Sequence, residues 1–261
     1  PDYAEAHNNL GGALQELGQL DEAVASYHKA LAIKPDYAQA HNNLGYALQE
    51  LGKHSDAFIH HRRAIKLDPE GSTFWAGLAT SLSSVSFTSI DDDLLQDLLS
   101  LVNRPTLRPS DITHPILSAL GYHAEFSQIL TRAGAHKLDS SFNYQHAAAQ
   151  LSGIPLFIRL ISLTHVADLK VERMLTTLRH LMLQEAIAGK TKDDGIPFAS
   201  ALALHCFTNE YVFAEMNEEK LSVEDLQKKI SELIEQKQNV PSSLIVTLAA
   251  YRPLHKFDWA Q

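Results

Sequence analysis

Apolar residues recur at helical spacing through the first part of the chain, in two blocks of equal length. Leu10, Leu14 and Leu17 form a stripe that recurs thirty-four residues later. Spacings of three and four residues place such side chains on one face of an α-helix. A glycine ends each stripe, Gly18 and then Gly52, because glycine adopts a left-handed backbone at least cost. The pattern predicts a helix followed by a stop in each block.

A second helix is predicted in the remainder of each block, with Asp21 and Ser55 as N-caps. Small residues such as Ala23 and Ala30 leave one face of this helix open to close approach by a partner. Pro35 follows the first block, and a proline there ends one unit and starts the next linker.

The two blocks are almost copies of each other in their first halves. Sixteen of the first eighteen positions match, and the exceptions are Glu5/Gln39 and Gly12/Tyr46. Only two of the remaining sixteen match. The stretch AHNNLG therefore occurs twice, which is the signature of a repeat architecture.

This frame resembles the tetratricopeptide repeat. The characteristic positions of that family fall on Leu10, Gly11, Gly18, Ala23, Tyr27, Ala30 and Pro35, and on Leu44, Gly45, Gly52, Ala57, Ala64 and Pro69. His7 and His41 depart from it, standing where an aromatic residue is usual, and His61 replaces the aromatic residue seen at Tyr27. The resemblance implies a right-handed α-solenoid of helical hairpins over residues 1–86, with two full repeats and one partial repeat that begins near Trp75. Because such units are stable only when stacked, we expect either that the remaining chain caps them or that a longer array precedes Pro1. The position of Pro1 inside a repeat linker supports the longer array.

Residues 87–261 also predict helices, and no strand alternation is apparent, so the predicted fold class is all-α. Residues 91–93 are three aspartates in a predicted first helical turn. Aspartates there stabilise the helix by interacting with its dipole, and we prefer this interpretation to a metal site. The predicted segments are a helix after Ser89, one around Ile112–Leu120, Pro155–Leu163, Asp168–Ala188, Pro197–Phe213, a helix opened by a capping box at Ser222–Asp225, and a last one from Pro241 to Tyr251. We expect these residues to form a second, irregular helical region.

The segment Phe198–Glu219, which reads FASALALHCFTNEYVFAEMNEE, resembles a region of bacterial proteins. In those proteins tetratricopeptide repeats precede an S-adenosylmethionine-dependent methyltransferase domain. The resemblance implies that residues 87–261 link or regulate a catalytic domain that lies beyond Gln261. The chain itself contains no GxGxxG loop of the kind that holds a dinucleotide or adenosyl cofactor, so we expect no cofactor within these residues.

Composition narrows the range of partners. Of 261 residues, 31 are acidic and 22 basic, which gives a net charge of −9. This charge disfavours nucleic acid and anionic membranes as partners, and no apolar run approaches the ~20 residues that span a bilayer. Cys206 is the one cysteine, so it has no internal disulfide partner, and a cytoplasmic location is expected.

The histidine and cysteine residues form no pattern that is typical of a metal site or a catalytic site. His60 and His61 diverge by about 100° as neighbours in a helix, so we expect them to join Arg62 and Arg63 in a solvated basic face rather than to bind a metal. Cys206 beside His205 is interpreted as a small buried hydrophobe. Neither a metal site nor a catalytic residue is predicted.

The recurrent asparagines are the main binding candidates. In the repeat frame the first helices line a concave groove, and a carboxamide both donates and accepts, so it can read a peptide backbone. Asn9 and Asn43 would do so one repeat apart, which is similar to the asparagine ladder of O-linked N-acetylglucosamine transferases. The competing interpretation is that both are surface residues retained from a duplication. The groove positions are Glu5, Asn8, Asn9, Gly12, Gln15, Glu16, Gln39, Asn42, Asn43, Tyr46, Gln49 and Glu50.

Outside the repeats, Asn209, Glu210 and Tyr211 are the better candidates, either as a functional group or as a buried pair that ties helices together. The leading hypothesis is a non-catalytic module that binds a protein or peptide. The alternative is the substrate-recruiting portion of a methyltransferase, with a glycosyltransferase as a weaker variant. The oligomeric state is left open.

Overall fold

The structure, a computed structural model, describes residues 3–85, 87–135, 141–190, 193–209 and 217–257. Within these residues the secondary structure consists of helices joined by turns, and no strand is present. The all-α prediction is therefore confirmed. Contacts divide the chain into two compact units, the first Pro1–Thr88 with Asn103–Arg108 and the second Ser89–Val102 with Pro109–Gln261. Each is described by itself.

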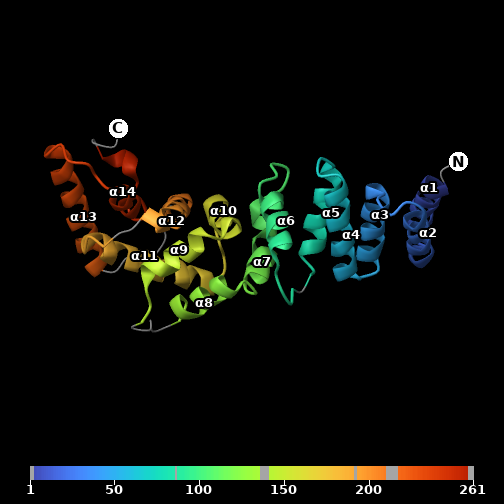
Figure 1. Ribbon diagram of the computed structural model, residues 1–261, viewed down its shortest axis with the longest axis horizontal. Coiled ribbons are helices and arrows are strands. Elements are labelled where there is room, and N and C mark those ends of the chain that lie inside the picture. Colours follow the sequence, from blue (N-terminus) through green and yellow to red (C-terminus); the bar gives the residue numbers. More distant parts are fainter. Residues whose placement is uncertain (1–2, 86, 136–140, 191–192, 210–216, 258–261) are drawn as a thin grey trace. The chain divides into compact units, whose positions relative to one another are not determined.

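The first unit is a series of antiparallel helical hairpins (Figure 1). Helix α1 packs on α2, α2 on α3, α3 on α4, and α4 on α5. The helices span α1 Tyr3–Glu16, α2 Leu20–Ile33, α3 Ala38–Glu50, α4 His54–Leu67 and α5 Ser72–Leu82. Helix α5 thus supplies the first half of the partial third repeat.

Glycine sets the turn within each hairpin. Gly18 and Gly52 both have φ of +74°, a conformation that a side chain disfavours. The amide of Gly18 donates to the carbonyl of Gln15 at 2.9 Å, and the next amide reaches back to Leu14 at 2.9 Å. These bonds satisfy carbonyls at the helix end. The predicted helix stops are confirmed.

The predicted N-caps of the second helices are wrong. Helix α2 begins at Leu20 and α4 at His54, so Asp21 and Ser55 lie inside the first turn. The N-cap positions are occupied by Gln19 and Lys53, without a side-chain cap bond. The reason is that the glycine turn brings the chain into the helix two residues after the left-handed position, before Asp21 is reached.

The apolar stripe is buried in the second repeat and only partly in the first. Leu44 is fully buried and Leu48 nearly so, against Tyr27 and Ala23 of α2. At the equivalent positions of α1, Leu10 is 51% exposed and Leu14 is partly buried, while Leu17, which follows the helix, is 74% exposed. The prediction that Leu10 and Leu17 belong to a buried stripe is wrong. Helix α2 packs on this face of α3, whereas no described helix packs on the corresponding face of α1.

Trp75 anchors the third half-repeat to the linker that precedes it. Its indole Nε1 donates to the carbonyl of Pro69 at 2.8 Å. Arg104 Nη2 donates to the same carbonyl at 2.6 Å, and the Arg104 guanidinium lies 4.5 Å from the centroid of the Trp75 ring. This cation–π contact fastens residues 103–108 to the first unit.

The second unit is an irregular helical domain built around α10 and α12. Helix α10 contacts α12, α6, α7 and α9, and α12 also contacts α14. Its elements are α6 Asp92–Val102, α7 Pro109–Leu120, α8 Ala124–Ala133, α9 Tyr144–Ser152, α10 Pro155–Leu163, α11 Leu169–Ile187, η1 Asp193–Gly195, α12 Ile196–Thr208, α13 Asn217–Glu235, α14 Ser242–Ala249 and η2 Leu254–Lys256. Phe157 of α10 is fully buried and meets the ring of Phe126 at 4.9 Å.

Several helix boundaries in this unit differ from the prediction. Asp91 rather than Ser89 caps α6, since its carboxylate accepts from the amide of Leu94 at 2.7 Å. Helix α13 begins at Asn217, so Ser222–Asp225 lies inside the helix and does not open it. The sequence interpretation did not include α8 and α9, although His123 and Asn143 cap them. Both helices are short, which weakens a periodic signal.

The length of the apolar helices bears on whether the chain could cross a membrane. In the part of the chain that the structure describes, no single helix is long and apolar enough to cross a bilayer. The pair α9 and α10, bent by 90° at its break, has the length and composition only when taken together.

Candidate functional site

A hollow lies between the first helices of the two full repeats. We call it the α1–α3 hollow. Its volume is about 450 Å³, and it is lined by Gly12, Gln15, Glu16, Tyr27, Asn43, Tyr46 and Glu50. Six of the seven were predicted to face the groove, and Tyr27 was not.

Tyr27 reaches the hollow from α2 because Gly11 makes room for its ring. A Cβ added at Gly11 would lie 2.6 Å from the ring atom Cε1. The Tyr27 hydroxyl donates to Gln15 Oε1 at 3.0 Å. Gln15 Nε2 in turn donates to Glu50 Oε1 of the next repeat at 2.6 Å. Gly11 and Tyr27 both fall on characteristic positions of the repeat, and this was the available signal for the phenol.

The environment of Tyr27 is electrostatically negative. Burial raises the pKa of the Tyr27 phenol, and the charges of Glu50 and Glu16 raise it further. Negative charge nearby disfavours a phenolate. Both carboxylates therefore act on the same oxygen, and the hydroxyl stays protonated as a donor.

The first asparagine of each AHNNLG copy is a packing residue. Asn8 is 6% exposed and Asn42 is 2% exposed. Asn42 Oδ1 lies 3.2 Å from His61 Nδ1, and Asn8 Oδ1 accepts from Asn43 Nδ2 at 3.0 Å. Buried carboxamides need such partners, which explains their recurrence without a ligand.

The second asparagine differs between the repeats. Asn9 is exposed, whereas Asn43 is half-buried. The Asn43 carboxamide donates to Asn8 and accepts from Gln39 Nε2 at 2.8 Å. Because a carboxamide has two donors and two lone pairs, Asn43 keeps one of each for a further contact.

Tyr46 and Gln49 connect α3 to α5. Gln49 Nε2 donates to Thr80 Oγ1 at 3.2 Å, and the Tyr46 hydroxyl lies 3.4 Å from the carbonyl of Thr73. These two predicted groove residues therefore join the second and third repeats, and Tyr46 also lines the α1–α3 hollow.

His61 lies in the core, so its predicted place on a solvated basic face is wrong. The ring is fully buried between glycines, since added Cβ atoms at Gly45 and Gly77 would lie 2.6 Å and 2.4 Å from it. Burial and the charge of His60 lower the pKa of His61 to about 4. It occupies the site of Tyr27 one repeat later.

His60 is partly buried and packs against another histidine. Its Nδ1 lies 3.0 Å from His41 Nδ1, and the two rings stack with centroids 5.2 Å apart. His41 Nε2 lies 3.0 Å from the carbonyl of Pro35, so His41 donates there and accepts from His60. Both rings are then neutral, and burial lowers the pKa of His60 to about 4. Among the described residues, no group of three or more His, Cys, Asp or Glu is placed to hold a metal.

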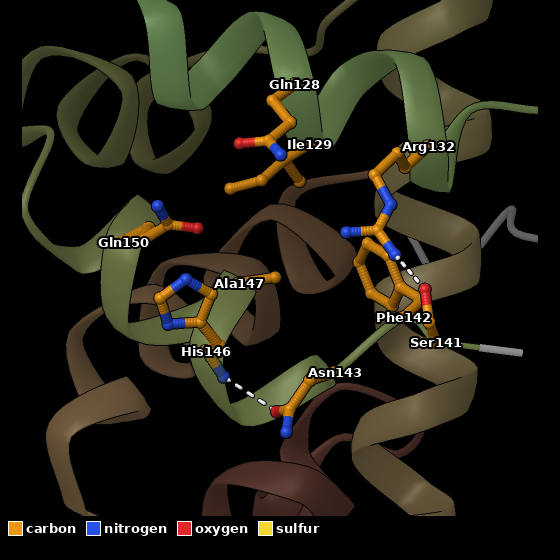
Figure 2. A pocket seen from close by; sticks show the side chains of 9 residues that line it. All are labelled: Gln128, Ile129, Arg132, Ser141, Phe142, Asn143, His146, Ala147 and Gln150. Atoms are coloured by element: carbon orange, nitrogen blue, oxygen red, sulfur yellow. Dashed lines mark hydrogen bonds between the residues drawn. The ribbon is translucent and has the colours of Figure 1, made fainter. Parts of the chain in front are cut away.

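A second hollow, of about 460 Å³, lies between α8 and α9 in the second unit. Figure 2 shows Gln128 and Arg132 on α8 facing His146 and Gln150 on α9. Arg132 Nη2 donates to Ser141 Oγ at 3.0 Å, so the guanidinium is already engaged. No sequence motif marks this hollow.

A buried polar network ties the last helices of the second unit together. The carboxylate of Glu219 accepts from the Tyr251 hydroxyl at 3.0 Å and lies 3.2 Å from His180 Nδ1. The Arg179 guanidinium lies 4.4 Å from the centroid of the Tyr251 ring. Burial raises the pKa of the nearby Cys206 thiol to about 11, which argues against a reactive thiolate.

Asn209 is placed by a structural contact. Its Nδ2 lies 3.0 Å from His205 Nε2, while His205 Nδ1 lies 2.9 Å from the carbonyl of Ile161 on α10. The carbonyl fixes the proton on Nδ1, and Nε2 accepts from Asn209. These contacts favour a structural role for Asn209, in which it helps to hold α12 against α10, over a reactive role. Glu210 and Tyr211 lie outside the described residues.

Comparison with known families bears on the repeats. A family described as TPR repeat matches residues 13–52, and one described as tetratricopeptide repeat matches residues 38–70. Residues 13–70 contain tetratricopeptide repeats. No curated protein matches the chain. Tetratricopeptide repeats support protein–protein interaction in general, and the matched residues include most of the α1–α3 hollow.

Proposed function

We propose that the first unit binds an extended peptide of a partner protein in the groove lined by α1 and α3. The α1–α3 hollow carries this proposal. It combines a buried phenol at its floor, an aromatic wall from Tyr46 and amide groups from Gln15 and Asn43. Apolar walls with a few fixed polar groups are typical of ligand sites.

The asparagines supply backbone contacts in this proposal. Asn9 is exposed on α1, and Asn43 has a donor and a lone pair left after its internal bonds. The burial of Asn8 and Asn42 removes them from the set of peptide contacts. A carboxamide pairs with peptide N–H and C=O groups whatever the side chain, so the two residues support affinity rather than specificity.

A blocking substitution tests the site. Gly12→Phe fills the hollow without disturbing the core, since an added Cβ would have only the Tyr27 hydroxyl nearby, at 3.9 Å. We expect peptides selected from a random display library on the wild-type chain to bind Gly12→Phe at least tenfold more weakly in fluorescence anisotropy. The matched control is Ala25→Phe on the exposed face of α2, which should leave affinity unchanged.

Equal binding by Gly12→Phe and the wild type would overturn the proposed site. Asn9→Ala and Asn43→Ala then test the backbone contacts. Each should weaken the selected peptides by roughly three- to tenfold, the loss of one net hydrogen bond. Unchanged affinity for both variants would contradict backbone recognition by the asparagines.

The methyltransferase alternative stays a prediction. The family matches lie within residues 13–70, and no feature of the described part of the second unit favours that alternative over a helical interaction module. Its test is the coding sequence beyond Gln261. A strand followed by a glycine-rich loop would favour it.

A further inference from the structure

The first helices of the repeats, which line the groove side of the first unit, lack basic residues. Helices α1, α3 and α5 contain no lysine or arginine. They carry Glu5, Glu16 and Glu50, all exposed. The basic side chains of the hairpins lie on the second helices, at Lys29, Arg62, Arg63 and Lys66. The second helices also carry acidic residues, so that side has both signs of charge, whereas the groove side is anionic.

Glu16 and Glu50 border the α1–α3 hollow without a basic partner. Among the described residues neither carboxylate forms an ion pair, and Glu50 is held only by the neutral amide of Gln15 at 2.6 Å. That amide is itself fixed by the Tyr27 hydroxyl. The Glu50 carboxylate is thus positioned by a chain of hydrogen bonds, and its charge is not neutralised.

The walls of the hollow also suit a cation. The faces of aromatic rings attract ammonium and guanidinium groups, and Tyr46 presents such a ring beside the two carboxylates. The long apolar stem of lysine or arginine packs against such a ring while its charged end reaches an acidic group. A volume of about 450 Å³ leaves room for one side chain of this length.

Building on the peptide-binding proposal, we infer that the α1–α3 hollow is a subsite for one lysine or arginine side chain of the bound peptide. The stem lies along Tyr46, and the charged group meets Glu16 and Glu50. The subsite sets which peptides bind, because an acidic residue at the same position would face two carboxylates.

Display selection provides the test. Random dodecapeptides are selected on the wild-type chain, on Glu16→Gln/Glu50→Gln, and on the control Asp21→Asn/Glu22→Gln, which removes two exposed charges from α2. We expect one position to be enriched in lysine or arginine on the wild type and the control, and this enrichment to disappear on the groove variant. Thermal unfolding of the three proteins checks that folding is retained.

A second measurement uses one selected peptide. Replacement of its basic residue by norleucine keeps the stem and removes the charge, and affinity should fall roughly tenfold for the wild type. It should change little for Glu16→Gln/Glu50→Gln. Affinity for the original peptide should also fall with added salt, since the contact is partly exposed.

The outcomes separate the two proposals. Selected peptides that lack a basic position but are still blocked by Gly12→Phe would overturn the lysine or arginine subsite and leave peptide binding intact. Peptides that bind Gly12→Phe as well as the wild type would overturn both. Equal loss with norleucine on the wild type and the groove variant would also contradict the subsite.

Discussion

The first and second repeats share almost the same first helix but not the same environment. Leu10 is 51% exposed, and its counterpart Leu44 is fully buried. Asn9 is exposed, whereas Asn43 bonds to Asn8 and Gln39. The difference arises because α3 has α2 behind it, while no described helix occupies that place for α1. Identical residues therefore have structural roles set by their neighbours.

The second half of each repeat shows the opposite relation, because different residues fill the equivalent space. In the first repeat Tyr27 fills the space over Gly11, and its hydroxyl lies near Gly12. In the second, the smaller His61 lies over Gly45, and Tyr46 packs against it with ring centroids 4.9 Å apart. The exchange of Gly12 for Tyr46 compensates for the exchange of Tyr27 for His61.

The largest expected effect separates the two leucines. Leu44→Ala should lower the free energy of unfolding of the first unit by about 2–5 kcal/mol, because it removes a fully buried side chain. Leu10→Ala should cost less than about 1 kcal/mol, since half of the side chain is already exposed. Urea unfolding followed by Trp75 fluorescence in a Trp259→Phe background measures both. Similar losses would contradict the assigned environments.

A smaller effect depends on pH and belongs to the second repeat alone. The pKa of His61 in the folded state is about 4, below the usual 6.5. The unfolded chain therefore binds the proton first, and stability is lost as pH falls from about 6.5 toward 4. Between pH 7.5 and 5 the contribution of His61 should be about 2 kcal/mol.

The measurement compares urea unfolding at the two pH values for the wild type and His61→Phe. The variant should show a smaller drop, and the drop that remains includes His60 and His41, whose pKa values are also lowered by burial. Tyr27→Phe in the first repeat is the control and should retain the full pH dependence. The same drop in His61→Phe would show that His61 is not the titrating group.

The smallest effect is the coupling between Tyr46 and His61. His61→Tyr alone should cost about 1–3 kcal/mol, because the larger ring would meet Tyr46. Adding Tyr46→Gly recreates the first-repeat pair and should recover part of that loss, with a coupling energy of about 1–2 kcal/mol in a double-mutant cycle. Additive changes would refute the compensation.

Much of the first unit could be predicted from sequence. The repeat frame located the hairpins, the glycine stops and six of the seven residues that line the α1–α3 hollow. It failed for Asn8 and Asn42 because a carboxamide in a helix has the same local signature whether it faces solvent or a buried neighbour. It failed for His61 because a histidine beside two arginines looks polar until the glycines that enclose it are known.

The second unit was less predictable. Its long helices followed from periodicity, but α8 and α9 are short, and their N-caps are His123 and Asn143. Such caps satisfy one or two amides and leave little periodic pattern. The network of Glu219, Tyr251 and Arg179 joins residues separated by more than thirty positions, and no spacing rule connects them.

The sequence by itself determined the helical class, the thirty-four-residue repeat and the absence of basic residues from the first helices, since these depend on residue type and order. Only the tertiary structure decided which asparagine is buried, which leucine is exposed, and that Tyr27, Glu16 and Glu50 meet at one hollow. Burial and charge proximity are properties of neighbours brought together by folding, and a repeated sequence does not specify what its first copy packs against.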